Sequence, residues 1–157
     1  MGRFEAKKVL ITGATSGIGL ATARRLTQEG AKLILTGTNA DRLAKLKAEL
    51  PSAEVLRNDA GEPEAHVALK EAVEKTLGKL DGAFLNAGFG RFHPLEEVSA
   101  DEFDAHFHVN VRGPLLQLKA LAPVLEPGAA IVLTTSRVQE MGLPAPAIYS
   151  ATQGALR

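Results

Sequence analysis

Short apolar runs alternate along this chain with longer segments of helical periodicity, and this alternation constrains the fold more than any other feature. Several of the runs are apolar on consecutive residues, as expected for strands that helices cover on both faces. We therefore predict an α/β fold in which a doubly wound parallel sheet of about five strands lies between two helical layers. The predicted strands are residues 9–12, 32–36, 54–58, 82–87 and 130–135.

Helices are predicted between the apolar runs. The first begins near Ser16 or Gly17 and ends at Gly30, a residue type suited to the left-handed turn past a helix end. Ser99 and Glu102 form a capping-box pattern that begins another helix. Two further segments repeat apolar residues at helical spacing: Leu43, Leu46 and Leu50 in one, and Ala65, Ala68, Leu69, Ala72, Val73 and Leu77 in the other.

Composition excludes several classes of partner. The length of 157 residues suits a single domain, residues 1–157. Eighteen basic residues balance eighteen acidic ones, so no net charge attracts nucleic acid or an anionic membrane. No apolar run approaches the ~18 residues of a membrane span, and the N-terminus MGRFEAKK lacks a hydrophobic signal segment. We expect a cytoplasmic protein that binds neither nucleic acid nor membrane.

Metal binding is not expected. The chain has no cysteine, which excludes a disulfide framework and a thiolate metal site and suits a reducing compartment. The four histidines are too scattered for a metal-ligand pattern, and we expect most of them at the surface: His66, His93, His106 and His108.

The glycine-rich stretch TGATSGIG, residues 12–19, follows the first predicted strand and opens the first predicted helix. Gly13 would permit a tight turn, Gly17 would let the backbone approach a pyrophosphate, and Gly19 would allow close helix packing. The helix N-terminus would offer free N–H groups and partial positive charge to that anion. A glycine-rich turn without a ligand is the alternative. We interpret the stretch as a dinucleotide site formed by Gly13, Thr15, Ser16, Gly17, Ile18 and Gly19.

The spacing TGxxxGxG resembles the cofactor turn of the short-chain dehydrogenase/reductase (SDR) family, and further motifs follow in the family's order. LNAG at residues 85–88 resembles the family's NNAG motif, with Asn86, Ala87 and Gly88 in place. Asp59 matches the acid that lies beside the adenine ring in the family. The resemblance spans nearly the whole chain. It implies a Rossmann-type dinucleotide-binding domain and an NAD(P)-dependent oxidoreductase acting on a small-molecule alcohol or ketone.

Three further residues match the family's catalytic Asn, Ser and Tyr: Asn110, Ser136 and Tyr149, the last two at the usual thirteen-residue step. Hydride transfer to a carbonyl needs a proton donor and hydrogen bonds that polarise the oxygen. The resemblance implies these roles for Tyr149 and Ser136. In the family a lysine four residues after the tyrosine supplies a positive charge, but this chain has Gln153. We therefore predict weak or absent turnover.

Asn110 follows Phe103 and Phe107 at the spacing i, i+4, i+7, which predicts an inward-facing position for all three. Pro114 cannot donate to the Asn110 carbonyl and tends to kink a helix there. The resemblance implies that the freed carbonyl helps to hold a water near the lysine position. A simple helix break at Gly113 and Pro114 is the alternative.

The end of the second predicted strand favours NADP over NAD. An acid there would bind the ribose hydroxyls of NAD, but the sequence reads LTGTNADRL and provides none. Thr38, Asn39 and Arg42 are candidates for the extra phosphate of NADP. Arg42 is equally well explained as an exposed helix charge.

Single residues keep simpler explanations. Asp59 could cap the helix that follows, Asn86 could form a turn, and Ser136 could cap a local bend.

Family members continue beyond this length with further strands and a substrate loop. Without them, we expect the strand at 130–135 to be a sheet edge although its composition suits a neighbour on each side. The family's helix after the tyrosine contributes to a subunit interface, so a full-length relative is expected to be a homo-oligomer. A non-catalytic nucleotide-binding protein and an inactive folding fragment are the alternatives to the enzyme.

Overall fold

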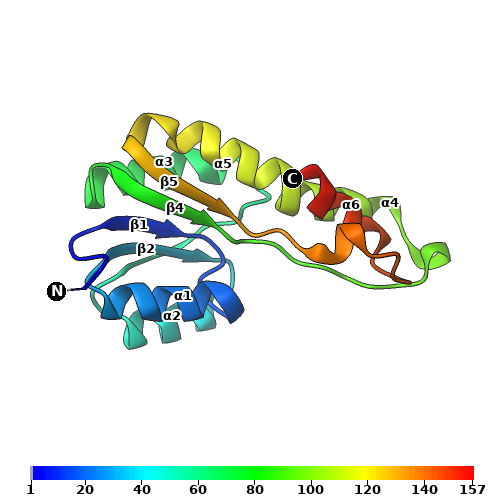
Figure 1. Ribbon diagram of the computed structural model, residues 1–157, viewed down its shortest axis with the longest axis horizontal. Coiled ribbons are helices and arrows are strands. Elements are labelled where there is room, and N and C mark those ends of the chain that lie inside the picture. The colour runs from blue at the N-terminus through cyan, green and yellow to red at the C-terminus, as the bar shows by residue number, and fades with distance from the viewer. Residues whose placement is uncertain (1) are drawn as a thin grey trace.

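The computed structural model describes residues 2–157, which form a five-stranded parallel sheet with the strand order β3-β2-β1-β4-β5 (Figure 1). The predicted fold class is confirmed. All five strands lie where the sequence predicts them, with ends shifted by a few residues: β1 Lys8–Ile11, β2 Lys32–Gly37, β3 Glu54–Arg57, β4 Leu80–Leu85 and β5 Leu125–Leu133.

Helices cover both faces of the sheet. Neighbouring residues of a strand point to opposite faces, so each strand contributes apolar side chains to both helical layers. Val9 and Ile11 belong to one hydrophobic cluster, whereas Leu10 between them belongs to another. The first cluster packs under α1 (Gly17–Gln28) and α2 (Ala40–Glu49), and the second under α3 (Pro63–Thr76) and α5 (Gly113–Leu121) (Figure 1). The consecutive apolar residues of these strands therefore supply both cores.

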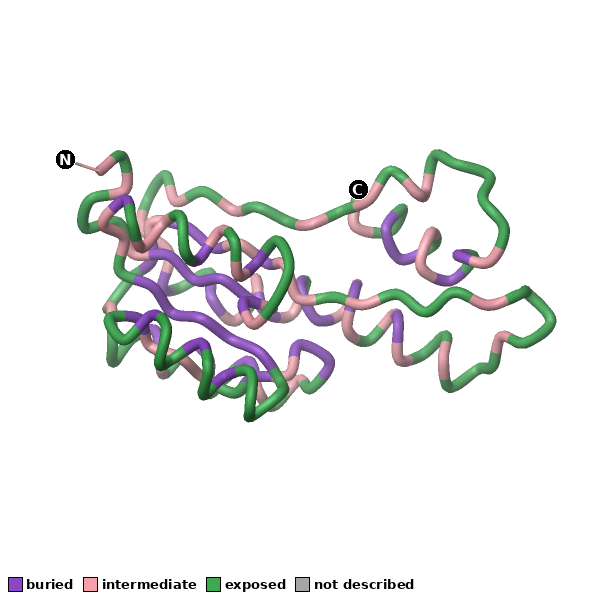
Figure 2. The backbone as a smooth tube through the Cα atoms, turned by 90° about the horizontal axis from the view of Figure 1, so that it is seen from below, coloured by how far each residue is buried: buried purple, intermediate pink, exposed green. Residues whose placement is uncertain are grey.

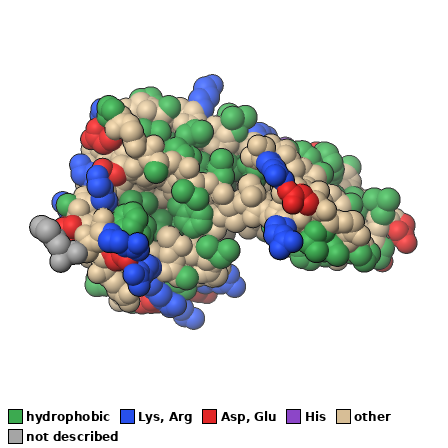
Figure 3. Space-filling model, viewed as in Figure 1, with side chains coloured by type: hydrophobic (Ala, Val, Ile, Leu, Met, Phe, Trp, Pro, Cys, Tyr) green, Lys and Arg blue, Asp and Glu red, His purple; other side chains and the backbone are tan. Residues whose placement is uncertain are grey.

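At β5, helices cover only one of the two faces of the sheet. β5 is an edge strand, as predicted, and Val132 is 53% exposed. Val132 pairs with Phe84 of β4 on the face that α1 and α2 cover elsewhere. A largely apolar groove of about 580 Å³ runs along this face between Phe4, Leu26 and Val132. Hydrophobic side chains are visible on the face of the molecule that carries β1 and β4 (Figure 3).

The remaining elements project beyond the carboxyl ends of the strands. They are η1 (Leu95–Glu97), α4 (Ala100–Phe107), a π-helical turn η2 (His108–Arg112), η4 (Arg137–Glu140) and α6 (Ala147–Ala155), while η3 (Ala122–Val124) leads from α5 into β5. The projecting part is mostly exposed, with short buried stretches in its helices, in contrast to the buried inner strands (Figure 2). In the described part of the chain, residues 2–157, no helix has the length and apolar character needed to cross a membrane.

Two expectations about single positions are wrong. Phe103 does not face inward: its side chain is 44% exposed and stacks on Phe107 along the outside of α4. The histidines are not mainly at the surface, because His66 and His106 are buried. Burial lowers the pKa of His66, and the positive charge of Arg112 acts in the same direction. The His106 ring is held between the Glu102 carbonyl of its own helix and the Arg91 N–H of the segment before it, whereas neither ring nitrogen of His66 has a hydrogen-bond partner among residues 2–157.

Candidate active site

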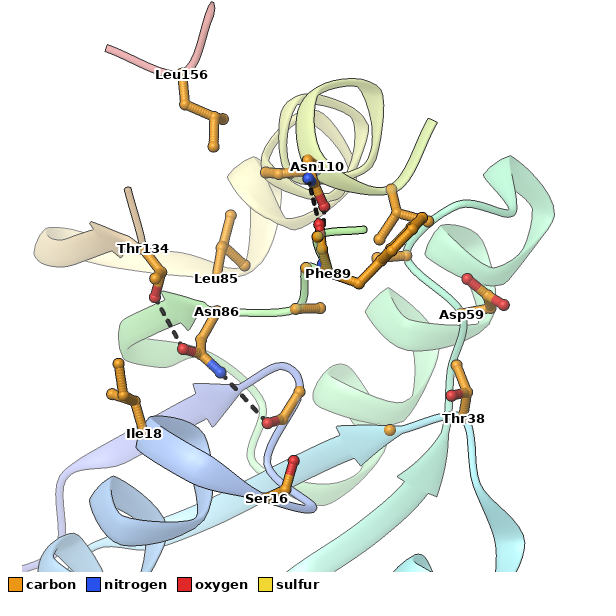
Figure 4. A pocket seen from close by; sticks show the side chains of 18 of the residues that line it. Ser16, Ile18, Thr38, Asp59, Leu85, Asn86, Phe89, Asn110, Thr134 and Leu156 are labelled. Atoms are coloured by element: carbon orange, nitrogen blue, oxygen red, sulfur yellow. Dashed lines mark hydrogen bonds between the residues drawn. The ribbon is translucent and has the colours of Figure 1, made fainter. Parts of the chain in front are cut away.

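A cavity of about 650 Å³ lies at the carboxyl ends of the strands, between the sheet and the projecting helices. It opens where the strand order reverses between β1 and β4, the place at which open α/β sheets bind ligands. Its lining brings together residues from seven segments of the chain, many of which Figure 4 shows as sticks. From the predicted site residues it includes Gly13, Thr15, Ser16, Ile18, Thr38, Asp59, Asn86, Ala87, Gly88, Asn110, Tyr149 and Gln153.

The glycine-rich turn between β1 and α1 depends on two of its glycines for close approach. Gly13 has a φ of +63°, and a Cβ there would lie 2.9 Å from the Ala87 Cα. A Cβ at Gly19 would lie 2.4 Å from the Gly13 carbonyl oxygen, so only glycine lets α1 begin this close to the turn. Gly17 has a φ of +53° with open space around its Cβ position. Gly17 and Gly19 support the turn without lining the cavity.

A network of polar side chains joins this turn to β4 and β5. The buried Thr12 hydroxyl accepts hydrogen bonds from the backbone N–H groups of Asn86 and Ala87, both at 3.0 Å. The Asn86 amide donates to the carbonyls of Thr12 and Gly13 and accepts from the Thr134 hydroxyl at 2.8 Å (Figure 4). Asn86 thus ties three segments together and does more than form a turn. No sequence motif indicates these contacts of Thr12 and Thr134, because their hydroxyls form these bonds only across the sheet.

Among residues 2–157, Asp59 is the only charged residue that lines the cavity. Its carboxylate accepts from the backbone N–H of Gly61 at 2.9 Å, which closes a local turn. The N-cap of α3 is Glu62, so Asp59 does not cap that helix. The neighbouring Asn58 is buried and bonded on both sides, to the Ala65 carbonyl and to Gln117 of α5. These bonds fix the loop after β3 against the cavity.

Asn110 is buried in the π-helical turn and connects three parts of the site. Its side-chain oxygen accepts from the Phe89 N–H at 3.0 Å, and its nitrogen donates to the Phe89 carbonyl at 2.8 Å (Figure 4). The same nitrogen donates to the Thr152 hydroxyl of α6 at 3.1 Å. The kink predicted at Pro114 takes the form of this π turn, in which the Gly113 N–H bonds to the His108 carbonyl. Gly113 is needed because a Cβ there would lie 2.5 Å from the Ala60 carbonyl oxygen.

Helix α6 presents Tyr149 and Gln153 to the cavity from the same helical face. The ring of Phe92 meets the Tyr149 ring edge-on, with 5.6 Å between centroids. Gln153 is only 4% exposed, and its Oε1 atom has no hydrogen-bond partner among residues 2–157. A buried amide oxygen without a partner is costly, and it therefore points to a donor that the protein itself does not supply.

Ser136 is not among the residues that line the cavity. Its hydroxyl oxygen accepts from the Val138 N–H at 3.2 Å and caps the short helix η4. The simpler explanation for this residue, a cap of a local bend, therefore describes its contact. This bond uses only the hydroxyl oxygen of Ser136. The hydroxyl hydrogen can therefore be donated to a further acceptor.

The phosphate candidates at the end of β2 are only partly brought to the cavity. Thr38 lines it, but Asn39 and Arg42 do not. The Asn39 side chain instead caps α2 by accepting from the Arg42 N–H at 2.9 Å. Arg57, which the sequence analysis did not select, donates from Nε to the Thr38 carbonyl at 3.3 Å. This bond places a guanidinium group beside the end of β2.

No group of three or more His, Cys, Asp or Glu side chains within residues 2–157 is arranged to hold a metal ion.

Known proteins of one family match this chain over nearly its whole length. The family model for short chain dehydrogenases matches residues 7–157. The versicolorin reductase stcU of Emericella nidulans is 34% identical over 160 residues, which cover 98% of this chain and 61% of the reductase. A Burkholderia phymatum short-chain dehydrogenase/reductase solved in complex with NAD superposes with a TM-score of 0.92 at 32% identity, over 99% of this chain and 58% of its own.

A Burkholderia cenocepacia short-chain dehydrogenase solved in complex with NADP also superposes with a TM-score of 0.92 at 32% identity, over 99% of this chain and 66% of its own. The chain thus spans 61% and 63% of the length of two of the curated relatives that it matches. Because the family model matches residues 7–157 of the 157, the chain belongs to the short-chain dehydrogenase family.

Proposed function

We propose that the cavity binds a nicotinamide dinucleotide, NADP in preference to NAD, and that it serves an oxidoreductase transferring hydride between the nicotinamide and a small alcohol or ketone. The observation that carries this proposal is the convergence of the glycine-rich turn and the Tyr149 helix on one cavity of about 650 Å³. One structural relative was solved in complex with NAD and another in complex with NADP. We take residues 1–157 as one dinucleotide-binding domain of a cytoplasmic protein, and we expect a full-length relative to be a homo-oligomer. The cysteine-free sequence supports a reducing compartment.

The residues present fit such a cofactor at both ends of the cavity. The turn at Gly13–Gly17 and the N-terminus of α1 would receive the pyrophosphate, since that helix end has unpaired N–H groups and no acidic side chain in its first turn. Asp59 would lie toward the adenine. The unpartnered Oε1 of Gln153 would accept a hydrogen bond from a hydroxyl of the nicotinamide ribose.

The charges around Thr38 favour NADP over NAD. No carboxylate lies at the end of β2 to hold two ribose hydroxyls, because Gly37 and Thr38 line the cavity there. Arg57 stands beside Thr38 through its bond to the carbonyl, and its guanidinium can bind a phosphate with two parallel hydrogen bonds. Arg42 lies in the first turn of α2 and is exposed. We assign the extra phosphate of NADP to Thr38 and Arg57 first, and to Arg42 second.

The chemistry is assigned to the end of the cavity formed by α6. When bound, the nicotinamide supplies or accepts the hydride. The Tyr149 phenol donates the proton to the carbonyl oxygen as the alcohol forms and accepts it in the reverse direction. The Ser136 hydroxyl is assigned to polarise the same carbonyl oxygen; it lies outside the cavity lining, and its oxygen accepts from the Val138 N–H, so its hydrogen is the part that would reach the substrate. Asn110 holds Phe89 and Thr152 in place around this end.

Gln153 favours a second candidate function, a nucleotide-binding protein without turnover. Glutamine offers hydrogen bonds to a ribose but no positive charge to favour proton release from the phenol. The loss of such a charge acts on the proton-transfer step more than on cofactor affinity. Binding and turnover therefore separate the two functions.

The proposal is tested by following the fluorescence of NADPH as the chain is added, with NADH in parallel. Gly19→Ala puts a Cβ where 2.4 Å separates it from the Gly13 carbonyl oxygen, so the turn must shift; Gly142→Ala places the same atom in open space and is the matched control. We expect saturable binding for the native chain and for Gly142→Ala, and at least about tenfold weaker binding for Gly19→Ala. Equal affinities in all three chains would place the nucleotide elsewhere.

The NADP preference has its own test. Arg57→Gln should weaken NADPH binding by about tenfold, because a charge-assisted hydrogen bond contributes roughly 1.5–3 kcal/mol, and should leave NADH binding unchanged. Lys75→Gln, a change of the same charge at the far end of α3, serves as the control. A parallel loss for both cofactors would remove Arg57 from the phosphate site.

A further inference from the structure

The segment from Phe89 to His93 runs between β4 and η1 and is tied to the neighbouring helix at alternate residues. Phe89 exchanges two hydrogen bonds with Asn110, the Arg91 N–H donates to His106 at 3.0 Å, and the His93 Nε2 lies 2.8 Å from a Glu102 carboxylate oxygen, an ion-pair distance without hydrogen-bond geometry. The three helix residues are Glu102, His106 and Asn110, at four-residue intervals along α4 and η2. We call this set the loop clamp.

His106 is the centre of the loop clamp, and both of its ring nitrogens are used. It is fully buried, with its Nδ1 2.8 Å from the Glu102 carbonyl oxygen and its Nε2 accepting from the Arg91 N–H. A carbonyl can only accept, so the hydrogen is on Nδ1 and Nε2 is bare. The ring also packs on the Phe89 ring, with 4.4 Å between centroids. A side chain without an acceptor at the Nε2 position would leave the Arg91 backbone N–H unpaired.

The residues between the tied positions face the cavity. Gly90 and Phe92 line it, and both lie against Tyr149. A Cβ at Gly90 would approach the Tyr149 ring to 3.1 Å, and the Phe92 ring meets that ring edge-on. Phe89, Arg91 and His93 contact the helix, and Phe89 also lines the cavity, whereas Gly90 and Phe92 form the wall next to the phenol. The loop clamp sets the position of that wall.

We propose that His106 is a positioning residue: its imidazole fixes the segment 89–93 on α4 so that Gly90 and Phe92 stay packed against Tyr149. The acceptor at Nε2 is the part that matters for the segment, because it is the contact to Arg91. The donor at Nδ1 holds the ring on its own helix through the Glu102 carbonyl. The relevance of this wall to substrate rests on the proposed function, but the positioning itself does not.

Two signals report the position of the segment without any cofactor, so a failed cofactor experiment does not decide this one. Tyr149 is the only tyrosine and the chain has no tryptophan, so the quenching of tyrosine fluorescence by acrylamide measures access to this one ring. Hydrogen exchange of the Arg91 amide, followed by NMR, measures the bond to His106. The Phe89 amide, which donates to Asn110, is the internal reference.

The variants separate a polar role from simple filling of the core. His106→Leu fills the site but removes both hydrogen bonds, whereas His106→Gln keeps one donor and one acceptor on a side chain long enough to reach both partners. We expect His106→Leu to speed exchange of the Arg91 amide at least about fivefold relative to Phe89, and to increase quenching of Tyr149. His106→Gln should return both signals close to native values. His108→Leu, at an exposed histidine two residues on, should change neither.

The proposal is overturned if His106→Leu leaves the Arg91 exchange and the Tyr149 quenching at native values, or if His106→Gln behaves like His106→Leu. Where far-UV circular dichroism shows that His106→Leu does not fold, His106→Asn takes its place. Its amide is too short to reach both partners while keeping polar atoms on the residue. Native values for His106→Asn would then overturn the proposal.

Discussion

β1 and β5 are apolar strands of the same parallel sheet, but they have different surroundings. β1 lies between two strands with a helix layer on each face, and Leu10 and Ile11 are fully buried. β5 has one neighbour, and its side chains on one face, Val132 among them, are exposed. The comparison shows that the part of the chain carrying the glycine-rich turn completes its own core, whereas the part leading to α6 does not.

The same contrast separates the two ends of the cavity. The turn after β1 is fixed by Thr12 and Asn86 on the inner strands. Tyr149 and Gln153 stand on α6, which packs on α4, η2 and η4 and not on the sheet. We therefore expect the cofactor end to be more stable than the catalytic end.

The largest effect is expected from truncating a leucine in each strand. Leu10→Ala in β1 leaves a cavity in a fully buried core and should cost about 2–5 kcal/mol of unfolding free energy. Leu133→Ala in β5 removes a side chain that is already 37% exposed and should cost about 1 kcal/mol or less. Urea unfolding followed by circular dichroism gives both values. Equal losses would mean that β5 is as well packed as β1.

Restoring a charge at the catalytic end should change rate and not affinity. Gln153→Lys is expected to raise the rate of NADPH oxidation with small ketones by about a hundredfold, because proton transfer from a positioned residue contributes that much. Gln28→Lys adds the same charge at an exposed position at the end of α1 and is the matched control. If Gln153→Lys gains no rate while NADPH still binds, the assignment of the lysine position is wrong.

Two threonines of one network allow a matched comparison of hydrogen bonds. Thr12→Val leaves the N–H groups of Asn86 and Ala87 without their acceptor and should destabilise the chain by about 2 kcal/mol. Thr134→Val removes one donor to Asn86 at the half-exposed end of β5, with an expected loss of about 1 kcal/mol. Thermal unfolding of the two variants ranks them. The opposite order would show that Asn86 depends on β5 more than on β1.

The smallest effect is a pH dependence of the contact between the N-terminal segment and β4. The Lys7 ammonium and the Lys8 N–H donate to Asp81 at 2.8 and 2.9 Å and lower its pKa, in that order. A carboxyl with a lowered pKa in the folded chain adds stability above its unfolded pKa of about 3.9, and this is lost as pH falls through the folded value. Asp81→Asn should therefore reduce the fall in melting temperature below about pH 4. An unchanged acid profile would show that Asp81 does not contribute to the loss of stability in acid.

The fold could be predicted because its main signals are local. Consecutive apolar residues such as Val9, Leu10 and Ile11 indicate a strand with two covered faces, and the glycines at 13 and 19 indicate a close strand-to-helix turn. The beginning of β5 was missed because Pro127 and Gly128 are typical of a turn. In the structure Gly128 has a φ of +83°, and the pairing with β4 shifts register across this stretch. The extra residues bulge out and the strand continues.

The contacts within the site could not be predicted, because they join residues far apart in the sequence. Thr12, Asn86 and Thr134 meet only when three strands lie side by side. The loop clamp depends on an extended segment lying along a helix, and no pattern in either segment alone indicates that pairing. Asn39 was selected for a phosphate and is instead a helix cap, since both roles favour the same residue type at a helix start.

The most direct test of the account is a calorimetric titration of this chain with NADPH and, in parallel, NADH. If the cofactor end is formed, one nucleotide should bind per chain in a saturable way, and NADPH should bind more tightly than NADH. If Gln153 limits the catalytic end, no turnover should be measurable until Gln153 is replaced by lysine. Absence of binding by both nucleotides would contradict the account, because it would mean that the cavity between the glycine-rich turn and α6 is not a formed dinucleotide site.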